Sequence, residues 1–273
     1  MAIPGLAALN KGGEVLPGRI SCASAGNCTA GGFYGDSHRH VQGFVVSESK
    51  GHWGKAIGVP GLGGLNKGGD ITHISVSCGS AGNCSVGGDY LDGSGHTQAF
   101  IANENKGHWG KAIEVPGTKT LNKGGFAVVS SLSCSPGGNC SAGGFYLIKH
   151  ADGQGFVVSE KNGTWGKAIE IPHLGRLNKG AEVAEFSVSC GAAGNCVAAG
   201  DYLDNEEGQF HGFVVSQAKG AWDQAMQLPG FKALKARFSH IGGISCPSPG
   251  HCAAIGSYRD HTGHEQGFVA SQK

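Results

Sequence analysis

The sequence has little charge and no long apolar segment. Charged residues make up 15% of the 273 positions, and Lys plus Arg (21) nearly balance Asp plus Glu (20). No block of like charge stands out, so the composition does not favour nucleic acid or an anionic membrane as a partner. No apolar run approaches the roughly 20 residues that a membrane helix needs. The first residues also lack the basic and long apolar regions of a signal peptide. We expect neither membrane insertion nor nucleic-acid binding.

Glycine and cysteine are what the chain has in abundance, and both follow a repeat. The 51 glycines show no every-third-residue period, which excludes collagen and indicates many tight turns. The cysteines form five pairs, each pair separated by five residues and each placed 56 positions after the last. The pairs are Cys22/Cys28, Cys78/Cys84, Cys134/Cys140, Cys190/Cys196 and Cys246/Cys252. The chain is therefore five copies of one unit.

Each copy divides into four short extended pieces separated by Gly, Ser, Asn and Asp clusters. In the second copy these are Ile74–Cys78, Cys84–Leu91, Thr97–Asn103 and Trp109–Val115. Four antiparallel strands per repeat predict a propeller blade, whereas a β-solenoid would need shorter repeats and capping units. We predict an all-β, five-bladed β-propeller in one domain, residues 1–273. Its blade repeats span about 14–61, 70–117, 126–173, 182–230 and 238–273 plus 1–6.

The two ends of the sequence are complementary parts of one blade. The fifth copy stops after its third strand, and Ile3–Leu6 matches the end of a fourth strand, as in Val59–Leu62. We therefore predict that the N-terminal strand closes the ring by pairing with the fifth copy. Five periods of 56 residues require 280 positions and 273 are present, so the outer strand of the fifth blade should be short. This start within a repeat suggests excision from a longer precursor or a trimmed chain.

The repeated motif resembles a known class of repeat. It runs S-C-x-x-x-G-x-C-x-x-x-G-x-Y, then G-F-V-V-S, then G-x-W-G-x-A-x-x-x-P. In this it resembles the cysteine-paired propeller repeats of secreted bacterial proteins, actinobacterial ones especially, over nearly the whole chain. It is more loosely similar to five-bladed lectins of the tachylectin type. The resemblance implies a β-propeller and extracellular life, and it implies no single activity.

The cysteine spacing favours five disulfides, one within each copy. A C-x5-C separation closes a small ring across a hairpin, and all ten cysteines are paired in this way. Each bridge contributes roughly 2 kcal/mol by the chain-entropy estimate. Structural zinc is the alternative, but it usually takes C-x2–4-C spacing with further ligands. Disulfides indicate an oxidising compartment, so we expect the protein to be secreted or on the cell surface.

The aromatic residues also keep fixed positions in the repeat. All five tyrosines lie six residues after the second cysteine of their copy, and all four tryptophans open the fourth strand. A tryptophan there can stack on a sugar, but covering the neighbouring strand is the more ordinary role. We therefore interpret both aromatic positions as packing residues.

Two polar elements are predicted to meet on one face of the ring. These are the Y-x-D loop between the second and third strands and the L-N-K-G-G link between blades. Carboxylate and amide oxygens accept hydrogen bonds from sugar hydroxyls, and ammonium groups donate them. The alternative is that Asp and Asn only cap turns while Lys is solvated. The candidate ligand-binding residues are Asn10, Lys11, Asp36, Asn66, Lys67, Asp92, Asn178, Lys179 and Asp204.

Departures from the pattern limit the number of predicted pockets. Ile148 replaces the aspartate in the third copy, and positions 234–237 in the link to the fifth read Leu-Lys-Ala-Arg. Pairing each link with the loop that follows gives three pockets, Asn10 with Asp36, Asn66 with Asp92 and Asn178 with Asp204.

Repeats this alike offer equivalent surfaces, whereas catalysis needs one asymmetric constellation. No G-x-S-x-G or H-E-x-x-H motif occurs. His38, His40, His261 and His264 would be neighbours in a closed ring, but exposed loop histidines are ordinary, so we predict no metal site. We predict a monomer without cofactor that is not an enzyme. The function is expected to be multivalent glycan binding, and the alternative is a structural scaffold that binds a surface protein.

Overall fold

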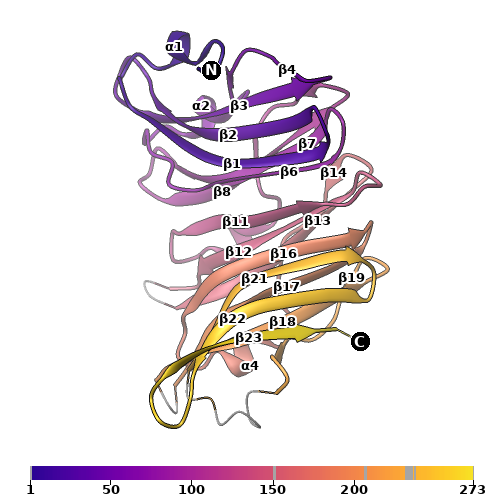
Figure 1. The fold of residues 1–273 in the computed structure, drawn as a ribbon. Coiled ribbons are helices and arrows are strands. Elements are labelled where there is room, and N and C mark those ends of the chain that lie inside the picture. The colour runs from indigo at the N-terminus through magenta and orange to yellow at the C-terminus, as the bar shows by residue number, and fades with distance from the viewer. Residues whose placement is uncertain (1, 150–151, 206–207, 231–235, 237, 273) are drawn as a thin grey trace.

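The computed structural model describes residues 2–149, 152–205, 208–230, 236 and 238–272. They form five antiparallel sheets in sequence order, four with five strands and the last with three. Figure 1 shows the sheets stacked from the first, at one end, to the fifth, at the other. We call them blades 1 to 5. No helix in the described ranges is long and apolar enough to cross a membrane.

The elements recur with the period of the sequence. Blade 1 contains β1 (Val15–Ser24), β2 (Asn27–Gly35), β3 (Val41–Ser49), β4 (His52–Trp53) and β5 (Ile57–Gly58). Blade 2 contains β6 (Ile74–Ser80), β7 (Asn83–Leu91), β8 (Thr97–Asn105), β9 (His108–Trp109) and β10 (Ile113–Glu114). Blade 3 contains β11 (Ala127–Cys134), β12 (Cys140–Leu147), β13 (Gly153–Lys161), β14 (Thr164–Trp165) and β15 (Ile169–Glu170). Blade 4 contains β16 (Val183–Ala192), β17 (Asn195–Asp204), β18 (Gln209–Ala218), β19 (Ala221–Trp222) and β20 (Met226–Gln227). Blade 5 contains β21 (Phe238–Ser248), β22 (His251–Arg259) and β23 (Glu265–Ser271).

Single helical turns begin the links between blades. They are α1 (Leu6–Leu9), α2 (Leu62–Leu65), α3 (Thr118–Leu121) and α4 (Leu174–Leu177). The residue before each helical turn has a positive φ. Before α2 this residue is Gly61, with a φ of 77°. Glycine adopts that backbone conformation without the strain that a Cβ would add. These helical turns were not predicted from the sequence.

All five predicted disulfides are present, and none of the ten cysteines is free. In blade 1 the paired cysteines lie opposite each other on β1 and β2. Gly26, at φ 72°, makes the tight turn between them. Five disulfides are typical of proteins from oxidising, extracellular environments. The bridges join Cys22 to Cys28, Cys78 to Cys84, Cys134 to Cys140, Cys190 to Cys196 and Cys246 to Cys252.

The predicted fourth strand is interrupted in blades 1 to 4. In blade 2 both β9 and β10 pair with β8, but Ala112 between them does not. The Ala112 N–H instead donates to the carbonyl of Pro60 in the preceding link, at 2.7 Å. The interruption therefore gives one blade a backbone hydrogen bond to the chain before it.

Blades also pack face to face through apolar side chains. Ile74 and Val76 on β6 belong to one buried cluster with Val45 of blade 1. The clusters at the other junctions likewise combine side chains of two consecutive blades. Burying these faces contributes roughly 25 cal/mol per Å² of apolar surface. The core of the protein therefore lies mainly between blades.

The end faces of the stack lack such a neighbour. Ile20 on β1 is 61% exposed, while Val76 at the same repeat position in blade 2 is 6% exposed. At the other end Val269 is 80% exposed, while its counterpart Val45 is fully buried. The two end sheets lie at opposite ends of the stack (Figure 1).

Ring closure by the N-terminal strand is not shown by this structure. Leu6 packs against Phe44 and Val46 of blade 1, and Pro4 accepts a hydrogen bond from Ala56. Within the described residues, the sheet of blade 5 consists of β21, β22 and β23 alone. The N-terminal segment thus occupies the place at blade 1 that the preceding link occupies at blades 2 to 4.

A hydroxyl contact joins each blade to the next at the level of the disulfides. Ser21 Oγ accepts the N–H of Cys78 at 3.0 Å, and the same contact recurs at Cys134, Cys190 and Cys246. Each of these amides lies on the first strand of its blade, facing the preceding blade. The serine of one repeat therefore satisfies the backbone of the next.

Substitution of Ser77 by Ala should lower the free energy of unfolding by about 1 kcal/mol, because the Cys134 amide loses its acceptor in a half-buried site. Ser245 occupies the same repeat position in blade 5, where it is exposed. The matched Ser245→Ala variant should match the parent within error. Urea unfolding measures both, and equal losses in the two variants would contradict the role of the serine contact.

Candidate functional site

The structure places the predicted loop and link residues on one end of the blades, here named the loop face. The loop face consists of the β2–β3 type loops and the inter-blade links. Gly12 in the first link donates to the carbonyl of Gly35, and Gly68 in the second donates to that of Leu91. These two links therefore lie against the loop of the blade that follows each of them.

The aspartates of the Y-x-D loops organise their own loops. Asp36 Oδ1 accepts the N–H groups of His38 and His40, and Oδ2 accepts the side-chain amide of Gln42. Burial alone would raise the pKa of Asp36, but these hydrogen bonds hold it below its ordinary value. Asp92 and Asp260 repeat the same pattern of hydrogen bonds. These carboxylates are ionised at neutral pH and fixed in orientation. Asp204 ends β17.

The asparagines of the links are used within the fold. Asn66 is 2% exposed, its amide donates to the carbonyl of Val41, and its oxygen accepts the N–H of Asp70. Asn178 is buried with equivalent contacts to Gly153 and Glu182, and Asn122 follows the same pattern. Asn10 caps its own link by accepting the N–H of Gly13. The amides hold links in place, whereas Lys11, Lys67 and Lys179 are exposed.

A cavity of about 410 Å³ lies on the loop face between blade 1 and the link that follows it. Tyr34, Asp36 and His40 contribute to it from blade 1, and Asn66 and Lys67 from the link that follows. The prediction had joined Asp36 to the preceding link, Asn10 and Lys11. The side chains that share this cavity come instead from the following link, because Asn66 extends back to Val41 at the start of β3. Positions 234, 235 and 237, in the link predicted to lack a pocket, lie outside the described residues.

The aromatic residues pack between blades, as interpreted from the sequence. Tyr90, Tyr146 and Tyr202 are buried, and the Tyr146 hydroxyl donates to Glu170. Each of three tryptophans donates its indole N–H to the preceding blade. The acceptors are Ser47 for Trp109, Asn103 for Trp165 and Ser159 for Trp222.

The disulfide cysteines take part in the packing between blades, and none of them lines the loop-face cavity. Cys196 is 3% exposed, and its Sγ lies 3.4 Å from Ser141 Oγ of the preceding blade. Cys252 is 8% exposed and belongs to a buried cluster with Val197 of blade 4. The prediction of these cysteines as disulfide partners is confirmed.

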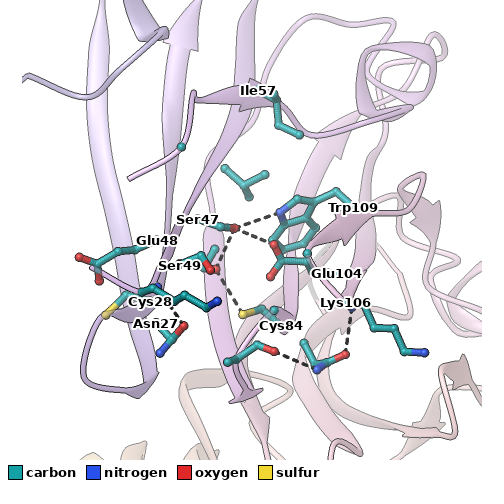
Figure 2. Close-up of a pocket in the computed structure, with 18 of the residues that line it drawn as sticks. Asn27, Cys28, Ser47, Glu48, Ser49, Ile57, Cys84, Glu104, Lys106 and Trp109 are labelled. Atoms are coloured by element: carbon teal, nitrogen blue, oxygen red, sulfur yellow. Dashed lines mark hydrogen bonds between the residues drawn. The ribbon is translucent and has the colours of Figure 1, made fainter. Parts of the chain in front are cut away.

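A second cavity, of about 680 Å³, lies between blades 1 and 2 at the opposite end, here named the hairpin end. It was not predicted from the sequence. Figure 2 shows the hydroxyl of Ser47 between the indole of Trp109 and the carboxyl of Glu104. Ser47 Oγ donates to Glu104 Oε1 at 2.8 Å. Lys50, Lys55 and Lys106 also line this cavity.

Glu104 is a buried carboxyl with one oxygen unused. It is 4% exposed, and its Oε2 has no hydrogen-bond partner. Burial raises the pKa of Glu104, and the hydrogen bond from Ser47 and the nearby His108 offset only part of that increase. A buried polar atom without a partner lowers stability and calls for an explanation.

The equivalent glutamate in blade 3 makes a full set of contacts. Glu160 accepts hydrogen bonds from the N–H groups of Cys140 and Gly163. It lines a cavity of about 520 Å³ between blades 2 and 3, which Glu104 also lines. In blade 2 the matching Gly107 amide already donates to the carbonyl of Gly82. The repeats therefore differ at this position, although their sequences are alike.

The two junctions differ at a position on the third strand and in the cysteine hairpin, which reads Gly-Ser-Ala-Gly at 79–82 in blade 2 and Ser-Pro-Gly-Gly at 135–138 in blade 3. Ser47 offers a hydroxyl proton to Glu104, whereas Asn103 at the same repeat position uses its oxygen to accept from Trp165 and Ser85. Glu160 therefore finds its donors in its own hairpins. The Ser-to-Asn change and the different cysteine hairpin are the sequence signals for this asymmetry.

Asp201, at the junction of blades 4 and 5, is another buried carboxyl that sequence reasoning missed. Its Oδ2 lies 2.6 Å from His240 Nδ1, and its Oδ1 accepts the Ile241 N–H. Burial raises its pKa to about 6, and these hydrogen bonds offset part of the effect. In the folded protein this carboxyl takes up its proton near pH 6.

The raised pKa makes stability depend on pH. Below the unfolded-state pKa, near 3.9, the carboxyl is protonated in both states and its contribution to stability is fully present. As pH rises through about 6, that contribution is lost, by up to about 3 kcal/mol. The difference in free energy of unfolding between the parent and Asp201→Asn should change by this amount between pH 4 and 7. Urea unfolding across this range checks it, and a constant difference would contradict the assignment.

No family model matches the sequence, and no curated protein matches it. Solved structures do match the fold. A Hadza microbial sialidase is 11% identical with a TM-score of 0.53, and the match covers 93% of this chain and 55% of the sialidase. An ulvan lyase is 9% identical with a TM-score of 0.51, covering 93% of this chain and 64% of the lyase. The β-propeller domain of the trilobed protease from Pyrococcus furiosus, which has an open velcro topology, is 7% identical with a TM-score of 0.52, covering 95% of this chain and 70% of that domain.

These likenesses define the fold as a β-propeller, and the chain spans about half the length of the sialidase. They also correct the expectation that the protein is not an enzyme. That expectation treated alike blades as unsuited to catalysis, but the sialidase and the lyase are enzymes of this fold. The physical reason is visible at Ser47 and Asn103, where one substitution makes two equivalent junctions chemically different.

Proposed function

We propose that the protein recognises carbohydrates through cavities on its loop face. The observation that carries the proposal is the cavity that joins Tyr34, Asp36 and His40 to Lys67. A fixed carboxylate accepts hydrogen bonds from sugar hydroxyls, and an ammonium and a phenol donate them. A small number of fixed polar groups in a concave site is the usual arrangement for binding a small ligand.

The same elements recur once more within the described part of the chain. Asp92 repeats the hydrogen bonds of Asp36, and Lys123 in the following link is exposed like Lys67. Repeated weak sites raise the apparent affinity for a multivalent surface by roughly 10²- to 10⁴-fold. The sialidase and the ulvan lyase that share the fold are named for their action on glycans, which supports carbohydrate as the ligand class.

A scaffold role is the second candidate, and the exposed end faces favour it. Ile20 and Val269 are large apolar side chains on opposite ends of the stack, in positions that are buried at the inner junctions. Exposed apolar surface of this kind commonly contacts another protein. A glycan-binding measurement separates the two functions, because a scaffold needs no sugar pocket.

The combined Asp36→Asn and Asp92→Asn variant should bind an array-identified glycan roughly tenfold more weakly, because a charged acceptor is lost while the loop turn is kept. Asp260→Asn is the matched control, since Asp260 makes the same turn in blade 5 and does not line the loop-face cavity. Calorimetry should give about two sites per chain. If the array shows no binding, or the double variant binds as well as the parent, the carbohydrate proposal fails.

A further inference from the structure

We infer that the hairpin-end cavity between blades 1 and 2 is a binding site for a sugar acid. One ligand hydroxyl bonds to Glu104 Oε2, and the ligand carboxylate lies among Lys50, Lys55 and Lys106. The inference takes carbohydrate as the ligand class from the proposed function, but its location and residues are independent of the loop face.

The unused oxygen of Glu104 is the first argument. The Glu104 carboxyl accepts a hydrogen bond from Ser47 at its Oε1 atom. Figure 2 shows this carboxyl beside Trp109, among the residues that line the cavity. Glu104 lines this cavity and the neighbouring one between blades 2 and 3, and its buried Oε2 has no hydrogen-bond partner within the protein. A hydroxyl suits this oxygen in both protonation states, because a hydroxyl can donate to a carboxylate or accept from a carboxylic acid.

The comparison with blade 3 shows that the unused oxygen is not a general property of the repeat. Glu160 has both oxygens bonded to backbone N–H groups of its own blade. Glu104 is drawn toward blade 1 by the Ser47 hydroxyl, and the Gly107 amide is already bonded to Gly82. A ligand in the cavity can supply the donor that Glu160 finds in its own blade.

The charged residues around the cavity indicate the sign of the charge that the ligand carries. Three lysines line it, against the two carboxyl groups of Glu48 and Glu104. The raised pKa of Glu104 favours its neutral form, which increases the positive excess. A cationic ligand is therefore disfavoured and an anionic group is favoured. Among the described residues no cluster of three or more His, Cys, Asp or Glu side chains is placed to hold a metal ion.

The size and walls of the cavity suit a saccharide. Its volume of about 680 Å³ is in the range of small-molecule sites. Trp109 and Ile57 provide apolar surface, while Asn27 and Asn83 add amide groups. A sugar ring with one carboxylate has a hydroxyl for Glu104, an anionic group for the lysines and an apolar face for Trp109.

The test uses the full chain, with D-glucuronic acid and a galacturonic acid trisaccharide as probes and methyl glucoside as the neutral comparison. Calorimetry and saturation-transfer NMR should show that the acids bind the parent protein more tightly than the glucoside does. Glu104→Ala should weaken acid binding by roughly tenfold or more, because it removes the buried partner of the hydroxyl. The matched Glu160→Ala variant should bind the acids like the parent.

A second variant tests the lysines without disturbing the hairpins. Lys50 and Lys106 have positive φ values, and Asn162 occupies the same position in blade 3 with φ 52°. The combined Lys50→Asn and Lys106→Asn variant therefore introduces a residue type that the same turn already contains in blade 3, so the hairpins should keep their conformation. The double variant should lose the preference for the acids over methyl glucoside, and added salt should reduce that preference in the parent.

The outcomes separate this inference from the proposed function. Acid binding should survive Asp36→Asn with Asp92→Asn, because those residues lie on the loop face. If Glu104→Ala binds the acids as well as the parent, or if the parent does not prefer them to methyl glucoside, the inference is overturned. If the loop-face variant alone abolishes acid binding, the proposed function stands and the hairpin-end site is rejected.

Discussion

The structure depends on the contact between consecutive blades. A lone sheet would leave one apolar face exposed, and it would leave unpaired the amides that the preceding repeat satisfies. The Ser21 hydroxyl accepts the Cys78 amide, and the carbonyl of Pro60 accepts the Ala112 amide. Both contacts recur in blades 3 and 4, so blades 2 to 4 are each bound to the preceding repeat at two levels. The disulfides stiffen the hairpins at this junction, where Thr29 Oγ1 lies 3.2 Å from Cys84 Sγ of the next blade.

The same contact also creates the chemical differences between repeats. Most positions at a junction must remain alike, because they pack against the same partners four times. A polar position that takes part in the inter-blade network can change without loss of packing, as Ser47 and Asn103 do. Such a change redirects the neighbouring glutamate and leaves one junction with an unsatisfied buried carboxyl. A repetitive fold can acquire an asymmetric site in this way.

The sequence predicted local and periodic features well. The fixed 56-residue spacing identified the blades, and the C-x5-C pairs identified all five disulfides, from Cys22 with Cys28 to Cys246 with Cys252. The loop face was also predicted, but the partner of Asp36 was not, because Asn66 reaches across a junction whose geometry the repeat does not reveal. Glu104 was missed because its environment depends on Ser47, 57 residues away and in another blade. Ring closure rested on matching the two termini, and matched sequence does not determine the distance between end blades.

Amide hydrogen exchange at the first cysteine of each repeat tests the inter-blade account most directly. The Cys78, Cys134, Cys190 and Cys246 amides are bonded to serine hydroxyls of the preceding blade. Cys22 is on the first blade, and Ser245, whose hydroxyl would accept its N–H in a closed ring, is exposed. NMR should therefore find four protected cysteine amides and rapid exchange at Cys22. Equal exchange at all five positions would contradict the account, whether all are protected by ring closure or all exchange freely.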